Sequence, residues 1–182
     1  MYKYFEDPLK YANFIDRPCE KCGSDKNCLD TIYFDYSSDD IESVCMDCLD
    51  QGKALVKIPS YIYQRISDEV RRYLGSDSEE KIKEQINLII NELERTPPVQ
   101  WIQNNDWQMC CGDAMKYLGE WTREDLDTMS ESKDGKKYLD SILVKDGNVD
   151  VVEIWDDIGD YVAIFVFKCN HCNRLVATWQ CF

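Results

Sequence analysis

Histidine is nearly absent from this sequence of 182 residues, in which His171 is the only one. Nucleophilic catalysis by Ser/His/Asp or Cys/His systems needs a free imidazole, but His171 lies between Cys169 and Cys172. A Gly-rich phosphate loop, a His-Glu-x-x-His segment and a His-x-Glu ahead of a cysteine pair are also missing. These absences argue against an enzyme, and we expect no catalytic residues.

Long apolar runs and a basic leader are lacking as well. No segment reaches the roughly 18–20 consecutive apolar residues that a membrane span requires. Residues 1–8 are polar and acidic, which is not the pattern of a secretory signal. The sequence therefore predicts a cytoplasmic protein with no membrane segment.

Positive charge is in short supply: 21 Lys and Arg residues face 35 Asp and Glu residues, for a net charge of −14. Nucleic-acid binding depends on cationic side chains that displace counterions from phosphates, so no nucleic-acid partner is expected. A negative surface instead favours encounter with a basic protein partner.

Cysteine, in contrast, is abundant, with ten in the chain. In a reducing cytosol, paired cysteines hold metal or carry out redox chemistry more often than they form disulfides. Cys19-x-x-Cys22 and Cys45-x-x-Cys48 are separated by residues 23–44. Two such pairs complete a tetrahedron of thiolates around zinc, so we predict a structural zinc site. Two redox pairs, or unpaired core thiols, are the alternatives.

A second metal site is predicted from Cys169 and Cys172, with Cys110 and Cys111 as the source of further ligands. Neighbouring cysteines seldom both reach one ion without strain, so His171 and Cys181 remain open as fourth ligands. Alternatively, Cys110 or Cys111 is a small buried hydrophobe. We expect Cys28 and Cys181 to be core or surface thiols.

The pattern of elements predicts an α+β fold in three parts. A zinc-ribbon-like N-terminal segment spans residues 1–58, with a strand at Thr31–Tyr36 and a short helical turn at Leu49–Leu55. A helical region spans residues 59–132. Residues 133–182 form a β-rich region with an antiparallel sheet and the Cys169-x-x-Cys172 knuckle, and this region packs as one unit with the helices.

Within the helical region, Pro59-Ser60 predicts a helix that runs to Leu74 and stops at Gly75. A second helix begins with a capping box from Ser76 to Glu79 and ends before Thr96-Pro97-Pro98. Shorter helices are expected from Asp113 through Leu118, and from Thr122, with Asp125 completing its cap. In the last part, turns are expected at Asp134-Gly135 and Asp146-Gly147, and the strands are expected at Val149–Trp155, Tyr161–Phe167 and Leu175–Trp179.

These residues together resemble the CbrC family, named from colicin-tolerance proteins of enteric bacteria. The similarity extends over nearly the whole chain and rests on the following motifs: Phe5-Glu6-Asp7-Pro8; both early cysteine pairs with Gly52 and Ala54; Arg95-Thr96-Pro97; Trp101 and Trp107; Cys111-Gly112-Asp113 with Leu118-Gly119; and Phe165-x-Phe167-x-Cys169-x-x-Cys172. This chain departs from the family in an extra charged helix over residues 76–94, in the lack of a Pro-Trp insert at the second pair, and in Asn173 where glycine is expected.

The resemblance implies tolerance to a nuclease toxin, and a nuclease must carry a basic surface that an acidic protein can cover. We therefore expect a non-enzymatic, zinc-stabilised bacterial protein that protects against such a toxin by binding it. A protein-binding adaptor with a zinc-ribbon-like fold, or a thiol-based redox enzyme, is the alternative.

Overall fold

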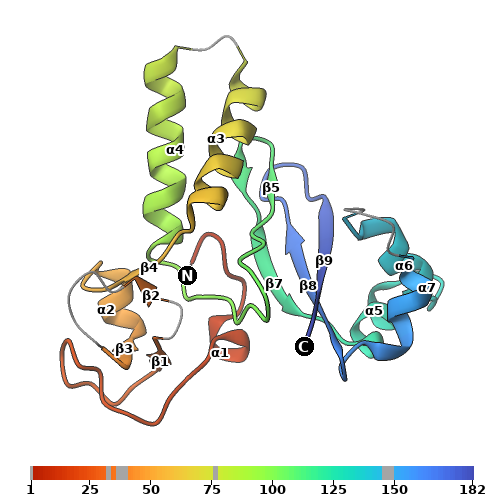
Figure 1. The fold of residues 1–182 in the computed structure, drawn as a ribbon, viewed down its shortest axis with the longest axis horizontal. Helices are drawn as coiled ribbons and strands as arrows, with labels where there is room; N and C mark the ends of the chain where they lie inside the picture. The colour runs from red at the N-terminus through yellow and green to blue at the C-terminus, as the bar shows by residue number, and fades with distance from the viewer. Residues whose placement is uncertain (1, 32–33, 36–40, 76–77, 145–149) are drawn as a thin grey trace.

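A computed structural model describes residues 2–31, 34–35, 41–75, 78–144 and 150–182 of the chain. It has an α+β fold in which a three-stranded antiparallel sheet lies between two groups of helices, with a small cysteine-containing lobe at one side (Figure 1). None of the described helices combines the length and the apolar character needed to cross a membrane.

The N-terminal lobe is built from short elements: α1 (Pro8–Tyr11), β1 (Cys28–Asp30), β2 (Phe34–Asp35), β3 (Ser43–Cys45), α2 (Met46–Asp50) and β4 (Leu55–Val56). Strand β1 pairs with β3, and β2 pairs with β4, both antiparallel. Leu29, Val44 and Leu49 are fully buried between these elements together with four cysteines. The strand expected at 31–36 is present in part as β2, while residues 32, 33 and 36 lie outside the described part. The short helix begins earlier than expected, at Met46.

Helices α3 (Ser60–Leu74) and α4 (Glu79–Leu93) form a hairpin that rises from the body of the molecule (Figure 1). The apolar stripes of the two helices belong to one buried cluster, and their buried members are Ile62, Ile66, Val70, Ile82, Ile86, Ile89 and Leu93. Helix α3 ends at Gly75, whose φ of 60° lies in the region that favours glycine, as expected. The observed N-cap of α4 is Ser78, which accepts from the Lys81 N–H. Ser76, the expected cap, lies outside the described residues.

The central sheet has the order β7 (Lys116–Glu120), β8 (Val162–Lys168), β9 (Leu175–Cys181). Strands β8 and β9 confirm two of the strands expected near the C-terminus. The helix expected from Asp113 through Leu118 is wrong, because these residues form β6 (Asp113–Ala114) and β7. The strand expected at Val149–Trp155 is also wrong: residues 151–154 form helix α7, and β7 takes the place beside β8.

Alternate residues of β8 point to opposite faces of the sheet, as strand geometry requires. Ala163, Phe165 and Phe167 belong to the buried cluster that also contains residues of α3 and α4 and the two tryptophans Trp101 and Trp107. The other face packs against three short helices, α5 (Arg123–Met129), α6 (Gly135–Ile142) and α7 (Val151–Ile154), followed by a 3₁₀ turn (Trp155–Asp157).

Side-chain caps explain where these short helices begin. The expected cap of α5 is confirmed, since Thr122 and Asp125 form a reciprocal capping box. The turn expected at Asp134-Gly135 is instead the start of α6, because the Asp134 side chain accepts from the Lys137 N–H. Asp150 likewise caps α7 by accepting from the Val152 N–H, which favours helix over strand in this β-branched stretch. Asp146-Gly147 lies outside the described residues.

The N-terminal residues extend the sheet at its free β7 edge. Phe5 pairs with Tyr117 in parallel, with the Tyr117 N–H donating to Tyr4 O at 2.8 Å and the Glu6 N–H donating to Tyr117 O at 2.9 Å. Tyr4 and Phe5 are fully buried. The segment therefore runs through the middle of the molecule, between the N-terminal lobe and the sheet.

Candidate metal centres

Eight of the ten cysteines gather in two groups of four. The Sγ atoms of Cys19, Cys22, Cys45 and Cys48 lie within 4.8 Å of one another, and we call this group centre 1. Those of Cys110, Cys111, Cys169 and Cys172 meet the same limit and form centre 2. The structure thus brings together all eight of the cysteines predicted as metal ligands.

The first half of centre 1 is a tight turn that aims two sulfurs at one point. The Cys22 and Gly23 N–H groups donate to Cys19 O at 3.3 and 2.7 Å, and Gly23 has a φ of 74°. A residue with a side chain rarely adopts this conformation, which explains the glycine directly after the pair.

The second half of centre 1 is the start of helix α2. Cys45 is the N-cap residue and Cys48 lies in the first turn, and both are buried with about 1% exposure. Redox pairs often occupy a helix start, so this placement alone does not distinguish a metal ligand from a redox thiol. The distinguishing observation is that Cys19 and Cys22 converge on the same point, with Cys22 Sγ 3.5 Å from Cys45 Sγ.

The surrounding backbone favours thiolate at one position of centre 1. Although burial by itself acts in the opposite direction, the pKa of the Cys19 thiol falls to about 7, because N–H groups of Cys45, Lys21 and Cys22 point at its sulfur. Burial raises the pKa of Cys45, and burial with the neighbouring sulfurs raises that of Cys48. Four thiols so close cannot all ionise without a cation between them, since like charges raise one another's pKa.

A two-residue hairpin turn supplies the first half of centre 2. Strand β5 (Met109–Cys110) pairs with β6, with Cys110 opposite Asp113, so Cys111 and Gly112 form the turn. Their φ values are 55° and 70°, the pattern of a type I′ turn. This turn explains how adjacent cysteines reach one point: Cys110 ends a strand, and the left-handed backbone of Cys111 brings its sulfur alongside, 3.7 Å away.

The second half of centre 2 is the knuckle between β8 and β9. The N–H groups of His171 and Cys172 both donate to Cys169 Sγ at 3.4 Å, and the Asn173 N–H donates to Cys169 O at 3.1 Å. Asn173, where the resembled family has glycine, adopts a φ of 61°. Asparagine tolerates this conformation better than most residues, so the turn is preserved.

The donor sets fit a tetrahedral thiolate-bound metal ion. Zn–S bonds of about 2.3 Å in a tetrahedron place sulfurs roughly 3.8 Å apart. The Cys22–Cys45 separation is 3.5 Å, the Cys110–Cys111 and Cys110–Cys172 separations are 3.7 Å, and the four sulfurs of each centre lie within 4.8 Å of one another. A disulfide needs about 2.05 Å, and all ten thiols are free. Both centres could therefore hold a metal ion, each through four cysteines.

The remaining candidate ligands lie elsewhere. The Nε2 atom of His171 is 3.0 Å from Asp113 Oδ2, and the ring is not part of the sulfur group. Cys181 ends β9, at the opposite end of the strand from the knuckle. Cys28 lies near centre 1, but its thiol donates to Ser24 O at 3.1 Å.

Exposure distinguishes the two centres. Only Cys22 of centre 1 is exposed, whereas in centre 2 Cys172 is exposed and Cys110 and Cys111 are partly exposed. The pKa of Cys172 is lowered to about 7, chiefly by the Arg174 N–H that points at its sulfur. Centre 2 is therefore the more accessible of the two.

A buried carboxylate beside centre 2 was not foreseen from the sequence, which had Asp113 as a helix cap. Its side chain is only 3% exposed and accepts from Lys3 Nζ at 2.8 Å, from the Ala114 N–H at 2.9 Å, and from the Tyr4 hydroxyl. His171 is its fourth partner. Asp113 therefore joins the N-terminal segment, the β5–β6 hairpin and the knuckle, through contacts between residues that are distant in sequence.

Comparison with known proteins gives one match. The family described as Uncharacterised protein family (UPF0167) matches residues 1–181. No curated protein and no solved structure matches this chain at a significant level.

Proposed function

This chain belongs to the UPF0167 family, and from that premise we propose that it is a zinc-stabilised, non-catalytic protein of the CbrC type that protects a bacterium by binding a basic nuclease toxin. The observation that carries the proposal is the gathering of eight free thiols into two groups of four. The choice of a basic nuclease as the partner rests on the net charge of the chain and on its resemblance to the CbrC family.

Zinc is the ion that the donor sets favour. Thiolate ligands in tetrahedral geometry are typical of zinc, while magnesium and calcium require oxygen ligands. Zinc supplies a cross-link between segments that are far apart in sequence, and binding contributes on the order of 10–16 kcal/mol in small zinc peptides. Among its described residues, the N-terminal lobe has strands of only two or three residues and a small buried cluster, so such a cross-link adds stability that these elements lack.

A role without catalysis agrees with the same geometry. Four protein ligands fill a tetrahedral zinc site, whereas catalytic zinc keeps one position for water or substrate. The single imidazole, on His171, is engaged with Asp113.

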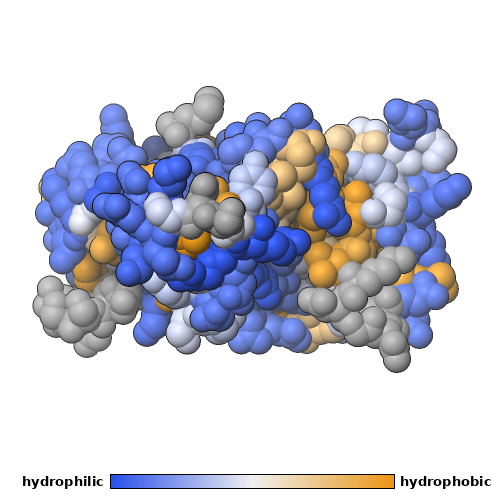
Figure 2. Space-filling model, turned by 90° about the horizontal axis from the view of Figure 1, so that it is seen from above, coloured by the Kyte–Doolittle hydropathy of each residue, from blue (hydrophilic) through white to orange (hydrophobic). Residues whose placement is uncertain are grey.

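A basic partner agrees with the net charge of −14. Figure 2 shows that the face seen from above is mostly hydrophilic, with its main hydrophobic patch in one half. Attraction between the net negative charge of this chain and a basic partner speeds association, and this attraction weakens as salt is added.

Metal content tests the structural half of the proposal. We expect two zinc ions per chain of the purified protein by elemental analysis, and one ion in each of the variants Cys48→Ser and Cys169→Ser. Cys28→Ser and Cys181→Ser are matched controls, because these thiols lie outside both centres, and should keep both ions. A metal-free wild-type protein whose circular dichroism and melting are unchanged by chelators would contradict the proposal.

Binding tests the second half. Purified nuclease toxin domains, titrated at low and at physiological salt, should bind the zinc-loaded protein and bind it more weakly as salt increases. Absent binding, or binding insensitive to salt, would argue against a nuclease partner and favour an adaptor role with another protein.

A thiol redox function is the second candidate. It is favoured by the position of Cys45 and Cys48 at a helix start and by the lowered pKa values of Cys19 and Cys172, both about 7. It predicts thiols that react with a dithiol substrate in the native protein. Thiols that react only after zinc is chelated would exclude it.

A further inference from the structure

A hollow of about 280 Å³ lies at the base of α3, away from both metal centres. The segment that follows β4, the first turn of α3, the end of α4 and the irregular stretch at 96–107 form its walls. Its apolar walls are supplied by Tyr61, three prolines, four aliphatic side chains and the edges of Trp101 and Trp107. This size is close to the lower end of small-molecule pockets, roughly 300 Å³.

Tyr61 is the accessible aromatic group of this hollow. Its side chain is 47% exposed, whereas Trp101 and Trp107 are only 8% and 4% exposed. The tryptophans form the floor, since Trp101 packs on Phe165 and Phe167 in the core and the Trp107 indole N–H donates to Met115 O. Tyr61 therefore offers an accessible ring on which a flat ligand in the hollow can stack.

Carboxamide groups also line the hollow, on Gln103, Asn104 and Asn105. Among the described residues, the side chains of Gln103 and Asn104 have no hydrogen-bond partner. Their backbone is held firmly: Gln180, 5% exposed, accepts from the Ile102 and Gln103 N–H groups at 2.9 Å and donates to Asn104 O at 2.6 Å. The backbone that carries these amides is thus fixed, and the amide groups themselves are available to a ligand.

The hollow is electrically unusual for this chain. Lys57 is the only charged residue among the described residues that line it, although the protein carries a net charge of −14. One cation is too little for a phosphate chain, and the absence of carboxylates disfavours a cationic ligand. The occupant that fits is uncharged.

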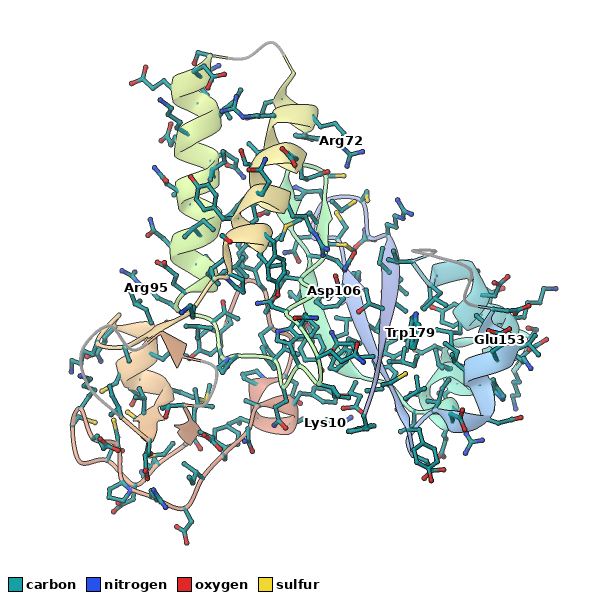
Figure 3. All side chains as sticks on the ribbon, in the orientation of Figure 1. Lys10, Arg72, Arg95, Asp106, Glu153 and Trp179 are labelled. Carbon is teal, nitrogen blue, oxygen red and sulfur yellow. The ribbon has the colours of Figure 1, made fainter. Side chains whose placement is uncertain are left out.

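The hollow continues into a second, shallower one. The two share Tyr61, Gln103, Asn104 and Asn105, and the second extends to Asp106 and Trp179, both labelled in Figure 3. Arg65 donates to Asp106 Oδ1 at 2.6 Å and to Trp107 O at 3.1 Å, which fixes this side of the site. A ligand in the first hollow therefore has room for a polar substituent.

We propose that this hollow binds a nucleobase-type heterocycle, as the free base or the nucleoside. Such rings stack on aromatic side chains and present an edge of donors and acceptors that Asn and Gln amides match in pairs. A ribose would extend toward Asp106. Single-stranded nucleic acid does not fit, because its phosphates would meet the negative charge of the chain. The proposal is independent of the metal centres and of the toxin partner.

Titration with adenosine, guanosine, cytidine and uridine tests the assignment, with tryptophan fluorescence and calorimetry as readouts. We expect saturable one-to-one binding of at least one nucleoside, with weaker binding of its monophosphate and of a single-stranded oligonucleotide. In Tyr61→Ala the affinity should fall by roughly tenfold, the typical effect of losing one stacking partner.

Tyr63→Ala is the matched control, because Tyr63 is 48% exposed on the same helix but does not line the hollow. It should bind like the wild type, while Asn104→Ala should weaken binding and change the preference among bases. No binding of any nucleoside at millimolar concentration would overturn the proposal, as would equal losses in Tyr61→Ala and Tyr63→Ala or tighter binding of the oligonucleotide. Metal content should be unchanged in all three variants, which separates this test from that of the proposed function.

Discussion

The buried carboxylate of Asp113 offers a direct test of how the two ends of the chain are held together. Replacing it in Asp113→Ala removes the acceptor for Lys3, Tyr4, His171 and the Ala114 N–H at once. The four losses differ in cost because the donors differ in their access to water. The side chains of Lys3 and His171 are 47% and 52% exposed and can return to solvent, whereas Tyr4 and Ala114 are buried.

Loss of the acceptor for the Tyr4 O–H dominates the expected effect, although the hydroxyl oxygen can still accept from Lys3 Nζ. A buried donor without an acceptor costs about 1–3 kcal/mol, and each of the partly exposed contacts of Lys3 and His171 contributes about 0–1 kcal/mol. The free energy of unfolding should therefore fall by roughly 2–4 kcal/mol. Tyr4→Phe combined with Asp113→Ala should cost less than the sum of the two single changes, because the double variant strands no hydroxyl.

Urea denaturation of the zinc-loaded protein, followed by tryptophan fluorescence, measures these differences. Glu131→Ala is the control for a lost negative charge, since Glu131 is exposed and has no ion pair among the described residues. It should change the free energy of unfolding by less than about 0.5 kcal/mol. A loss below about 1 kcal/mol in Asp113→Ala, or strict additivity with Tyr4→Phe, would refute the reasoning.

Three further changes probe the turns and the pH response. Gly112→Ala should destabilise the protein by more than about 1 kcal/mol and weaken zinc binding at centre 2, because the added Cβ would lie 2.5 Å from the Tyr73 ring. Gly75→Ala is the control, since Gly75 has a similar φ but no atom within 4 Å of the added Cβ, and it should lower the melting temperature less. Asn173→Gly should keep or slightly raise the melting temperature while Asn173→Ala lowers it, since its φ is 61°, and equal values for the two would contradict this. Burial, with Asp50 and Asp47 nearby, raises the pKa of Tyr2 to about 12 from 10.0, so its contribution is complete below pH 10 and is lost as the pH rises toward 12. The melting temperature, measured from pH 9 to 12, should therefore fall less steeply with pH in Tyr2→Phe than in the wild type. An unchanged slope would exclude this role.

Centre 1 could be foreseen because its geometry is local. The spacing of Cys19 and Cys22, with Gly23 after them, is enough to form the turn, and the second pair repeats the same spacing. The long helices were equally accessible, since the apolar stripe of α4 and the Gly75 stop of α3 are encoded within a few residues. Local physical rules were sufficient for both.

Centre 2 and its surroundings depend on contacts that no local pattern encodes. The sequence around Asp113 is compatible with a helix cap, and only the partnership with Tyr4 and Lys3 explains why it lies in a strand. The stretch at 151–154 is rich in β-branched residues, but the place beside β8 is taken by β7, and the Asp150 cap favours helix. The carboxamide-lined hollow likewise depends on Gln180, which reaches the loop from the far end of the chain.

The position of residues 2–5 affects when the protein can fold during synthesis. The Tyr2 hydroxyl donates to Met46 O, Tyr117 pairs with Phe5, and Asn170 donates to Lys3 O. Residues 2–5 therefore depend on partners as far along the chain as Asn170, a pattern of distant contacts that slows folding. A nascent chain stalled before residue 169 would leave residues 2–5 without the Asn170 contact and β8 without its partner β9, so folding of the central region should follow synthesis of both.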